Sequence, residues 1–339
     1  MDEECDHVRL NTFQLLFIDS PNQKESLKVA GNLLLSTTNK MLQDTTKLPC
    51  IECLKCITSI LLDFNNLKPI PINIFKEEKW PKELGKVLER IVKTKNIEYN
   101  YIKLVFQIIP QLFYLSNDSW LQGNDKFLTL IVSLCEVRLR MVLGEYDKIE
   151  EREVEDVCDV LEFVVREIEN GNYMDSLATK LSLLIQKSIS FLCEWIHEVY
   201  IEKLTINSRC EEKIYQTIVD FFSIGGGEMI ETRTLKEGIE ALQSISLRYL
   251  KEDISKGRSL VCILTNCPSL PDTTLKYLLE YYNTSPDDNY KNKALDDLGI
   301  ILEEFKDRCD FYNITSLKEL KTLSLDINDI KIKEIIENM

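Results

Sequence analysis

Two neighbouring segments near the middle of the chain carry apolar side chains at helical spacing, and they constrain the fold more than any other part of the sequence. Between positions 150 and 170, apolar residues recur along a single stripe formed by Val154, Val157, Cys158, Leu161, Val164, Val165 and Ile168. This spacing is that of one face of an α-helix. Between positions 173 and 204, two such stripes run side by side, which predicts a helix buried on more than one side. Together the segments predict an inner and an outer layer of stacked helices.

The rest of the chain repeats this pattern with short breaks. Further helices are predicted over residues 8–18, 21–43, 50–64, 82–95, 98–115, 124–144, 208–223, 233–252, 256–266, 272–283, 286–308, 316–325 and 328–338. An unbroken helix over 173–204 would be about 48 Å long, so we expect a break near residues 186–190. The chain has only 11 Gly and 9 Pro, too few for a turn-rich β architecture. The sequence therefore predicts an all-α fold of about fifteen helices.

The predicted helices follow one another closely enough to form a single elongated domain over residues 1–339. An irregular stretch at 66–80 interrupts them, because its prolines preclude a continuous helix. The apolar residues of this stretch either pack against the protein's own helices or form a partner-binding edge. The triplet Gly225-Gly226-Gly227 follows a helix rather than a strand, which predicts a flexible joint at 224–231.

A short string of small residues marks one of the predicted helices. Residues 25–34 contain Ala30-Gly31-Asn32-Leu33, and residues 259–267 carry a fainter version of this string. In this respect the chain resembles the armadillo and HEAT families of helical repeats, although it lacks their fixed period of about 40 residues. The resemblance implies a right-handed α-solenoid that binds an extended peptide or a partner helix in its groove. It implies no chemistry.

The charge balance limits the partners that we expect. With 41 basic and 56 acidic residues the net charge is −15, which repels phosphate backbones and anionic membranes. The acidic first residues do not resemble a secretion signal, and the longest apolar run, 104–117, is too short to span a bilayer. The eleven cysteines are an odd number and lie mostly within helical patterns, which predicts reduced thiols. We therefore expect a cytoplasmic or nuclear protein with no direct contact to nucleic acid or membrane.

Few residue patterns in the chain could support catalysis or metal binding. Cys50, Cys53 and Cys56 have the spacing that opens some iron–sulfur motifs, but no fourth cysteine follows closely, and small core residues on a helix are the favoured interpretation. The set Cys193, His197 and Cys210 matches no known zinc module. With two histidines and no nucleophile or phosphate-loop motif, the sequence predicts no catalytic residue and no cofactor.

Two charged surfaces are candidate partner-binding sites. Residues 145–175 hold 12 acids and 3 bases, and the densest part consists of Glu150, Glu151, Glu153, Glu155, Asp156 and Asp159. A basic stripe recurs at helical spacing in Lys82, Lys86, Arg90 and Lys93. Each is either a solvated outer face or a docking surface, the acidic one for a basic segment of a partner.

These observations predict a non-enzymatic scaffold or adaptor that binds other proteins. Two alternatives stay open at this point. One is a regulatory or assembly-chaperone subunit of a larger intracellular enzyme complex. The other is a metal–thiolate protein that uses Cys50, Cys53 and Cys56.

Overall fold

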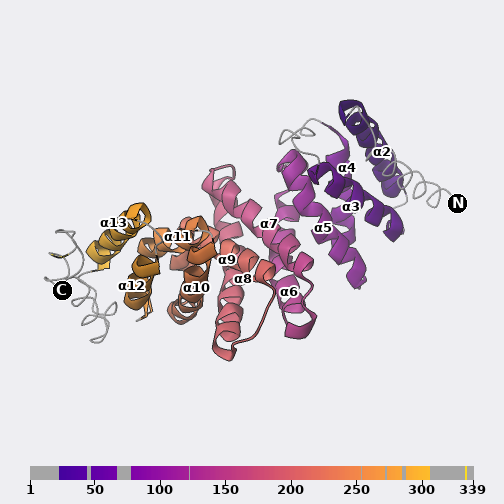
Figure 1. Ribbon diagram of the computed structural model, residues 1–339. Helices are drawn as coiled ribbons and strands as arrows, with labels where there is room; N and C mark the ends of the chain where they lie inside the picture. Colours follow the sequence, from indigo (N-terminus) through magenta and orange to yellow (C-terminus); the bar gives the residue numbers. More distant parts are fainter. Residues whose placement is uncertain are drawn as a thin grey trace. The chain divides into compact units, whose positions relative to one another are not determined.

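The protein is all-α in the computed structural model, which describes residues 23–43, 47–66, 78–121, 123–252, 254–271, 273–284, 288–305 and 333 (Figure 1). Twelve α-helices and no strand occur within these ranges, so the predicted fold class is confirmed. The helices are α2 (Gln23–Gln43), α3 (Ile51–Asn66), α4 (Trp80–Lys93), α5 (Tyr99–Ser116), α6 (Asp125–Val142), α7 (Glu151–Glu169), α8 (Asp175–Glu202), α9 (Ser208–Ser223), α10 (Thr232–Glu252), α11 (Ile254–Ile263), α12 (Thr274–Thr284) and α13 (Asp288–Phe305). Short 3-10 helices lie at η1 (Tyr146–Lys148), η2 (Gly226–Met229) and η3 (Leu264–Asn266).

Most helix ends fall within two residues of the predicted positions. Helix α4 starts at Trp80 rather than at 82, because Pro81 fits a first helical turn, where its missing N–H is not needed. The predicted helices at 8–18, 316–325 and 328–338 lie outside the described residues, residue 333 excepted, as do residues 67–77 of the irregular stretch. The total of about fifteen helices therefore stays a prediction.

The predicted break in the long helix is wrong, because α8 runs unbroken for 28 residues. No Gly or Pro lies between 186 and 190, so nothing in that stretch interrupts the backbone hydrogen bonds. Ser188 is fully buried there. A few residues further on, α10 packs so closely that a methyl group built on Gly238 would lie 2.7 Å from Cys193 Cβ. Helix α8 therefore packs closely on α10 just beyond the stretch where a break was expected.

The chain divides into two compact units. Unit 1 is Met1–Cys135 with Glu155–Phe163, and unit 2 is Glu136–Val154 with Val164–Met339. Helices α6 and α7 therefore each contribute residues to both units. The sequence predicted one elongated domain, and that organisation stays a prediction.

In unit 1, α2 packs on α4, α3 packs on α5, and α4 packs on α5. Trp80, fully buried at the start of α4, lies over Gly31 of α2, where an added methyl group would be 3.5 Å from the indole Cδ1. Trp120 lies closer still to α4, because a methyl group on Gly85 would be 2.7 Å from its ring. For Trp80, the last residue of the irregular stretch, the structure therefore shows packing against the protein's own helices.

In unit 2, α8 packs on α9 and α10, α9 on α11, α10 on α11 and α12, and α12 on α13. Buried polar contacts add to this packing. Gln243 Nε2 donates to Thr274 Oγ1 at 2.7 Å, and the Ser246 and Tyr277 hydroxyls lie 2.8 Å apart, which ties α10 to α12. Such contacts fix the register of two helices, because a shift would leave buried polar groups without partners.

The segment predicted to be a flexible joint is a packed turn in the structure. Gly225 has a φ of 83°, a left-handed conformation that glycine adopts at no steric cost. Gly226 and Gly227 are buried in η2, and a methyl group on Gly226 would lie 2.3 Å from the Phe221 ring. The flexibility expected of this segment stays a prediction.

Candidate functional site

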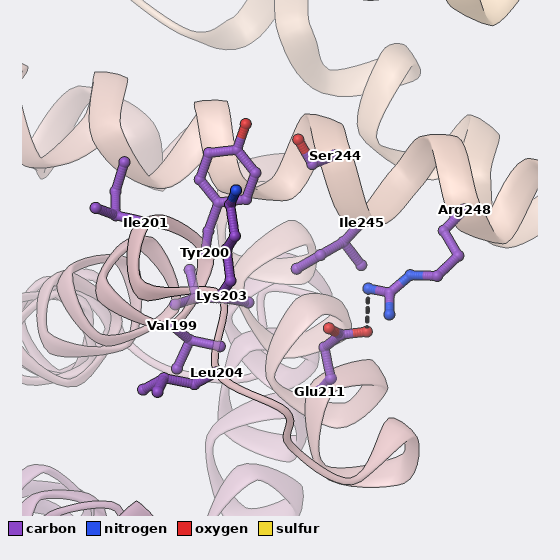
Figure 2. Close-up of a pocket in the computed structure, with 10 residues that line it drawn as sticks. Val199, Tyr200, Ile201, Lys203, Leu204, Glu211, Ser244, Ile245 and Arg248 are labelled. Atoms are coloured by element: carbon purple, nitrogen blue, oxygen red, sulfur yellow. Dashed lines mark hydrogen bonds and ion pairs between the residues drawn. The ribbon is translucent and has the colours of Figure 1, made fainter.

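An open groove of about 480 Å³ in unit 2 is a candidate site (Figure 2). It lies where the carboxyl end of α8 meets the first turn of α9 and the middle of α10. We call it the α8–α10 groove. Its apolar lining is Ile196, Val199, Tyr200, Ile201, Leu204 and Ile245, and its polar lining is Lys203, Glu211, Ser244 and Arg248.

Helix α8 ends beside the groove with a left-handed residue. Lys203 has φ 53° and ψ 41°, and the N–H of Leu204 donates to the Val199 carbonyl at 3.0 Å. This arrangement satisfies carbonyls that a helix end would otherwise leave unpaired. Four residues later, the Asn207 side chain accepts the N–H of Arg209 at 2.8 Å and caps the start of α9. The short connection therefore leaves Lys203 and Leu204 at the edge of the groove.

The apolar lining grades from a buried floor to an exposed lip. Ile196, Val199 and Ile245 are buried. At the lip, Tyr200 is 40% exposed and Ile201 is 59% exposed. Burial of these two side chains by a ligand would be favourable, since about 25 cal/mol is gained per Å² of apolar surface removed from water.

An ion pair between Arg248 and Glu211 lines one end of the groove. Arg248 Nη2 lies 2.6 Å from Glu211 Oε1, and the guanidinium lies 5.9 Å from the ring centroid of Tyr249. The Tyr249 hydroxyl also donates to Glu211 Oε1, at 3.4 Å. Burial first, and then the negative charges of Glu211 and Glu212, raise the pKa of Tyr249, so its hydroxyl remains a donor.

Lys203 lies on the other side of the groove. In Figure 2, Lys203 and Arg248 are drawn on opposite sides of Ile245. Lys203 is exposed and forms no ion pair with any residue that the structure describes. The groove therefore has an apolar floor and a cation on each of two sides.

The structure changes the interpretation of the acidic residues of α7. Glu150 is exposed, and Glu151, Glu155 and Asp159 are half-buried. Glu153 and Asp156 are only 2% and 4% exposed, so the prediction that they belong to a solvated outer face is wrong.

The physical reason is a second buried face on α7. Val160, Phe163 and Glu167 are buried beside the predicted apolar stripe, and Glu153 and Asp156 fall on their side of the helix. Glu153 can be buried because Arg138 Nη2 of α6 lies 2.7 Å from its Oε2. Val160 and Phe163 were the sequence signal for this second face, which the density of acids obscured.

The basic stripe of α4 is largely engaged within the protein. Lys86 pairs with Glu83 at 2.8 Å, and Lys93 pairs with Glu89 on the same helix. Arg90 is half-buried, and its Nη2 donates to the Met41 carbonyl at 2.7 Å, in the last turn of α2. A cation at this position stabilises the carboxyl end of a helix. Of the four residues, Lys82 is half-buried, whereas Lys86 and Lys93 are exposed.

The cysteines within the described ranges do not assemble into a metal site. Cys53 and Cys56 are buried on α3, and Cys50 precedes that helix. Burial first, and then the charge of Glu52, raise the pKa of the Cys56 thiol, which disfavours the thiolate that a metal needs. Among the described residues, no group of three or more His, Cys, Asp and Glu side chains could hold a metal ion, and this includes the set around Cys193, His197 and Cys210.

Comparison with known proteins identifies no relative, because no family model, no curated protein and no solved structure matches this chain. Among the described helices, none combines the length and the apolar composition that crossing a membrane requires. The function is therefore inferred from the geometry of the groove. The sequence did not indicate this groove, because its two apolar stripes predicted that residues 173–204 form a helix buried on more than one side. The available signal was the pair Tyr200-Ile201, which adds apolar residues at the charged end of that helix.

Proposed function

We propose that this protein is a non-enzymatic scaffold or adaptor that binds other proteins, and that the α8–α10 groove is one of its binding surfaces. The observation that carries the proposal is the exposed apolar lip, Tyr200 and Ile201, beside a groove of about 480 Å³ with a buried apolar floor. Concave apolar surfaces with a few placed polar groups are typical of binding sites. A cytoplasmic or nuclear location is the expectation that accompanies this function.

The proposal includes a helical-repeat architecture. Helices pack on the next-but-one helix in both units, as in the pairs α2–α4 and α3–α5 and in the series α8–α10–α12. Paired-helix repeats pack in this way, because equivalent helices of successive repeats form one layer. This packing supports the armadillo/HEAT resemblance, and a right-handed solenoid is the form that we propose.

The acidic residues of α7 are a weaker candidate surface for a basic partner segment. Two of the six predicted residues, Glu153 and Asp156, are buried, and Glu153 forms an ion pair with Arg138. The basic stripe of α4 is likewise engaged with Glu83, Glu89 and the end of α2. The groove is therefore the surface to test first.

Ile201→Glu tests the proposal directly, because it places a charge at the groove lip without touching the core. Ile300→Glu on α13 is the matched control, since Ile300 is 60% exposed and Ile201 is 59% exposed. Both variants and the unaltered protein would be captured from cells that make the protein, with partners quantified by crosslinking mass spectrometry. We expect at least one partner to be reduced about tenfold by Ile201→Glu, equivalent to about 1.4 kcal/mol, and retained by Ile300→Glu.

Circular dichroism of both variants would establish that each retains its helical content. If Ile201→Glu and Ile300→Glu recover the same partners in the same amounts, the groove is not a partner-binding surface and the proposal fails.

A further inference from the structure

The charges around the α8–α10 groove indicate the chemistry of the segment that it binds. Three charged side chains line it, which are Lys203, Glu211 and Arg248. Glu211 is 8% exposed and lies 2.6 Å from Arg248, so its negative charge is largely balanced within the protein. The same pair balances Arg248, so the three lining charges sum to +1 and the excess positive charge is that of Lys203, although the whole chain carries −15.

The side chain of Arg248 is restricted in conformation in the absence of a ligand. Its side chain is 53% exposed, and the contacts with Glu211 and the Tyr249 ring restrict its conformations before any ligand binds. A guanidinium offers five donors in a planar fork that matches a carboxylate. A side chain fixed in advance loses less conformational entropy on binding, which favours affinity.

Lys203 supplies the second cation. Its left-handed conformation ends α8 and places the residue at the groove edge. Glu202 precedes it and is exposed, and Glu198 lies one turn earlier, but neither carboxylate lines the groove. The apolar floor thus lies between two cationic side chains, of which Arg248 is already paired with Glu211.

We propose that the groove binds a segment of a partner protein in which one or two large apolar side chains are flanked by carboxylates. The apolar side chains lie over Val199 and Ile245, and the carboxylates meet Lys203 and Arg248. The volume of about 480 Å³ falls within the range of about 300–1,000 Å³ that is usual for binding pockets. An amphipathic helix with apolar anchors one turn apart is the simplest segment of this kind. This inference rests on the proposed function and specifies the partner's chemistry.

The test uses the full chain and three short, fluorescently labelled synthetic peptides. The first has two leucines one helical turn apart with flanking glutamates. The second replaces the glutamates with lysines, and the third replaces the leucines with serines. We expect the full chain to bind the first peptide at least about tenfold more tightly than either of the others, measured by fluorescence anisotropy. Equal or tighter binding of the lysine peptide overturns the inference.

Charge-reversed variants locate the binding. Lys203→Glu should weaken binding of the glutamate peptide about tenfold. The control is Lys187→Glu, which changes an exposed lysine of α8 that does not line the groove and should leave the binding unchanged. The double variant Glu211→Arg with Arg248→Glu keeps an ion pair but puts the carboxylate at the exposed position. It should shift the preference toward the lysine peptide. If the glutamate peptide binds all variants equally, it does not bind in this groove and the inference fails.

The outcomes separate this inference from the proposed function. If Ile201→Glu loses cellular partners but the peptides show no charge preference, the scaffold function stands and the acidic-segment inference is wrong. If the glutamate peptide binds as expected and Ile201→Glu loses no partner, the inference about the chemistry of the bound segment is supported. The proposal that the groove binds partners in cells is then overturned. If dodecanoate binds with the same variant dependence while no peptide binds, the ligand is an anionic lipid, and the inference is overturned.

Discussion

Two glycines inside helices have opposite surroundings, although both are helix-interior positions in the sequence. A methyl group on Gly31 of α2 would lie 3.5 Å from Trp80, which is ordinary contact. A methyl group on Gly238 of α10 would lie 2.7 Å from Cys193 Cβ, closer than such carbons approach. At Gly238 the absence of a side chain is therefore what permits the close approach of α10 to α8.

We expect Gly31→Ala and Gly238→Ala to change stability in opposite directions. Alanine raises helix propensity by about 0.8–1.0 kcal/mol relative to glycine, so Gly31→Ala should increase the free energy of unfolding. In Gly238→Ala the clash with Cys193 should outweigh this gain and lower that free energy by about 1–3 kcal/mol. Urea unfolding of both variants measures the change. A stabilising effect of Gly238→Ala would contradict the close α8–α10 contact.

At the scale of helices, charged side chains form contacts between different helices, and the spacing of residues in the sequence did not predict these contacts. Arg90 belongs to α4 but donates to the last turn of α2. Arg138 of α6 pairs with Glu153 of α7, and these side chains are only 4% and 2% exposed. A buried pair of this kind does not by itself make a protein more stable than apolar residues would, but loss of one partner leaves an uncompensated buried charge.

Glu153→Gln should therefore be strongly destabilising, by about 3–5 kcal/mol, because it leaves the charge of Arg138 buried and uncompensated. The matched control is Glu136→Gln on α6, which removes the half-buried partner of the exposed Arg140 at 3.0 Å and should cost no more than about 1 kcal/mol. Guanidinium unfolding followed by circular dichroism compares the two variants. If both variants lose the same free energy of unfolding, the Arg138–Glu153 pair is not buried away from water as the structure shows it.

At the scale of the whole molecule, the three tryptophans are divided between the two units. Trp80 and Trp120 lie in unit 1, and Trp195 lies in unit 2, where its Nε1 donates to the Leu143 carbonyl at 3.2 Å. All three side chains are buried, so the fluorescence of each should change when its unit unfolds. Chains with more than one compact unit commonly depart from a single two-state transition.

Unfolding followed by tryptophan fluorescence should resolve the two units. In Trp195→Phe the remaining signal comes from unit 1, and in the double variant Trp80→Phe with Trp120→Phe it comes from unit 2. We expect the fluorescence midpoint in guanidinium to differ from the circular dichroism midpoint in at least one of these variants, because circular dichroism averages both units. Coincidence of the two midpoints in both variants would mean that the chain unfolds as one cooperative body.

The sequence alone determined the fold class and the positions of most helices. Apolar spacing and helix-end signals depend on residues within a few positions of one another, so they can be recognised along the chain. The boundaries of α9 are those predicted, whereas α4 begins and ends two residues before its predicted bounds and includes Trp80 and Pro81 in its first turn.

The tertiary structure alone decided which faces are buried and where a binding groove forms. The burial of Glu153 depends on Arg138, 15 residues away, and the groove depends on Glu211 and Arg248, 37 residues apart. A carboxylate on a helix has the same local pattern whether it faces solvent or an arginine of another helix. The exposure of the carboxylate is set by contacts between different helices. The spacing of residues along one helix does not indicate those contacts.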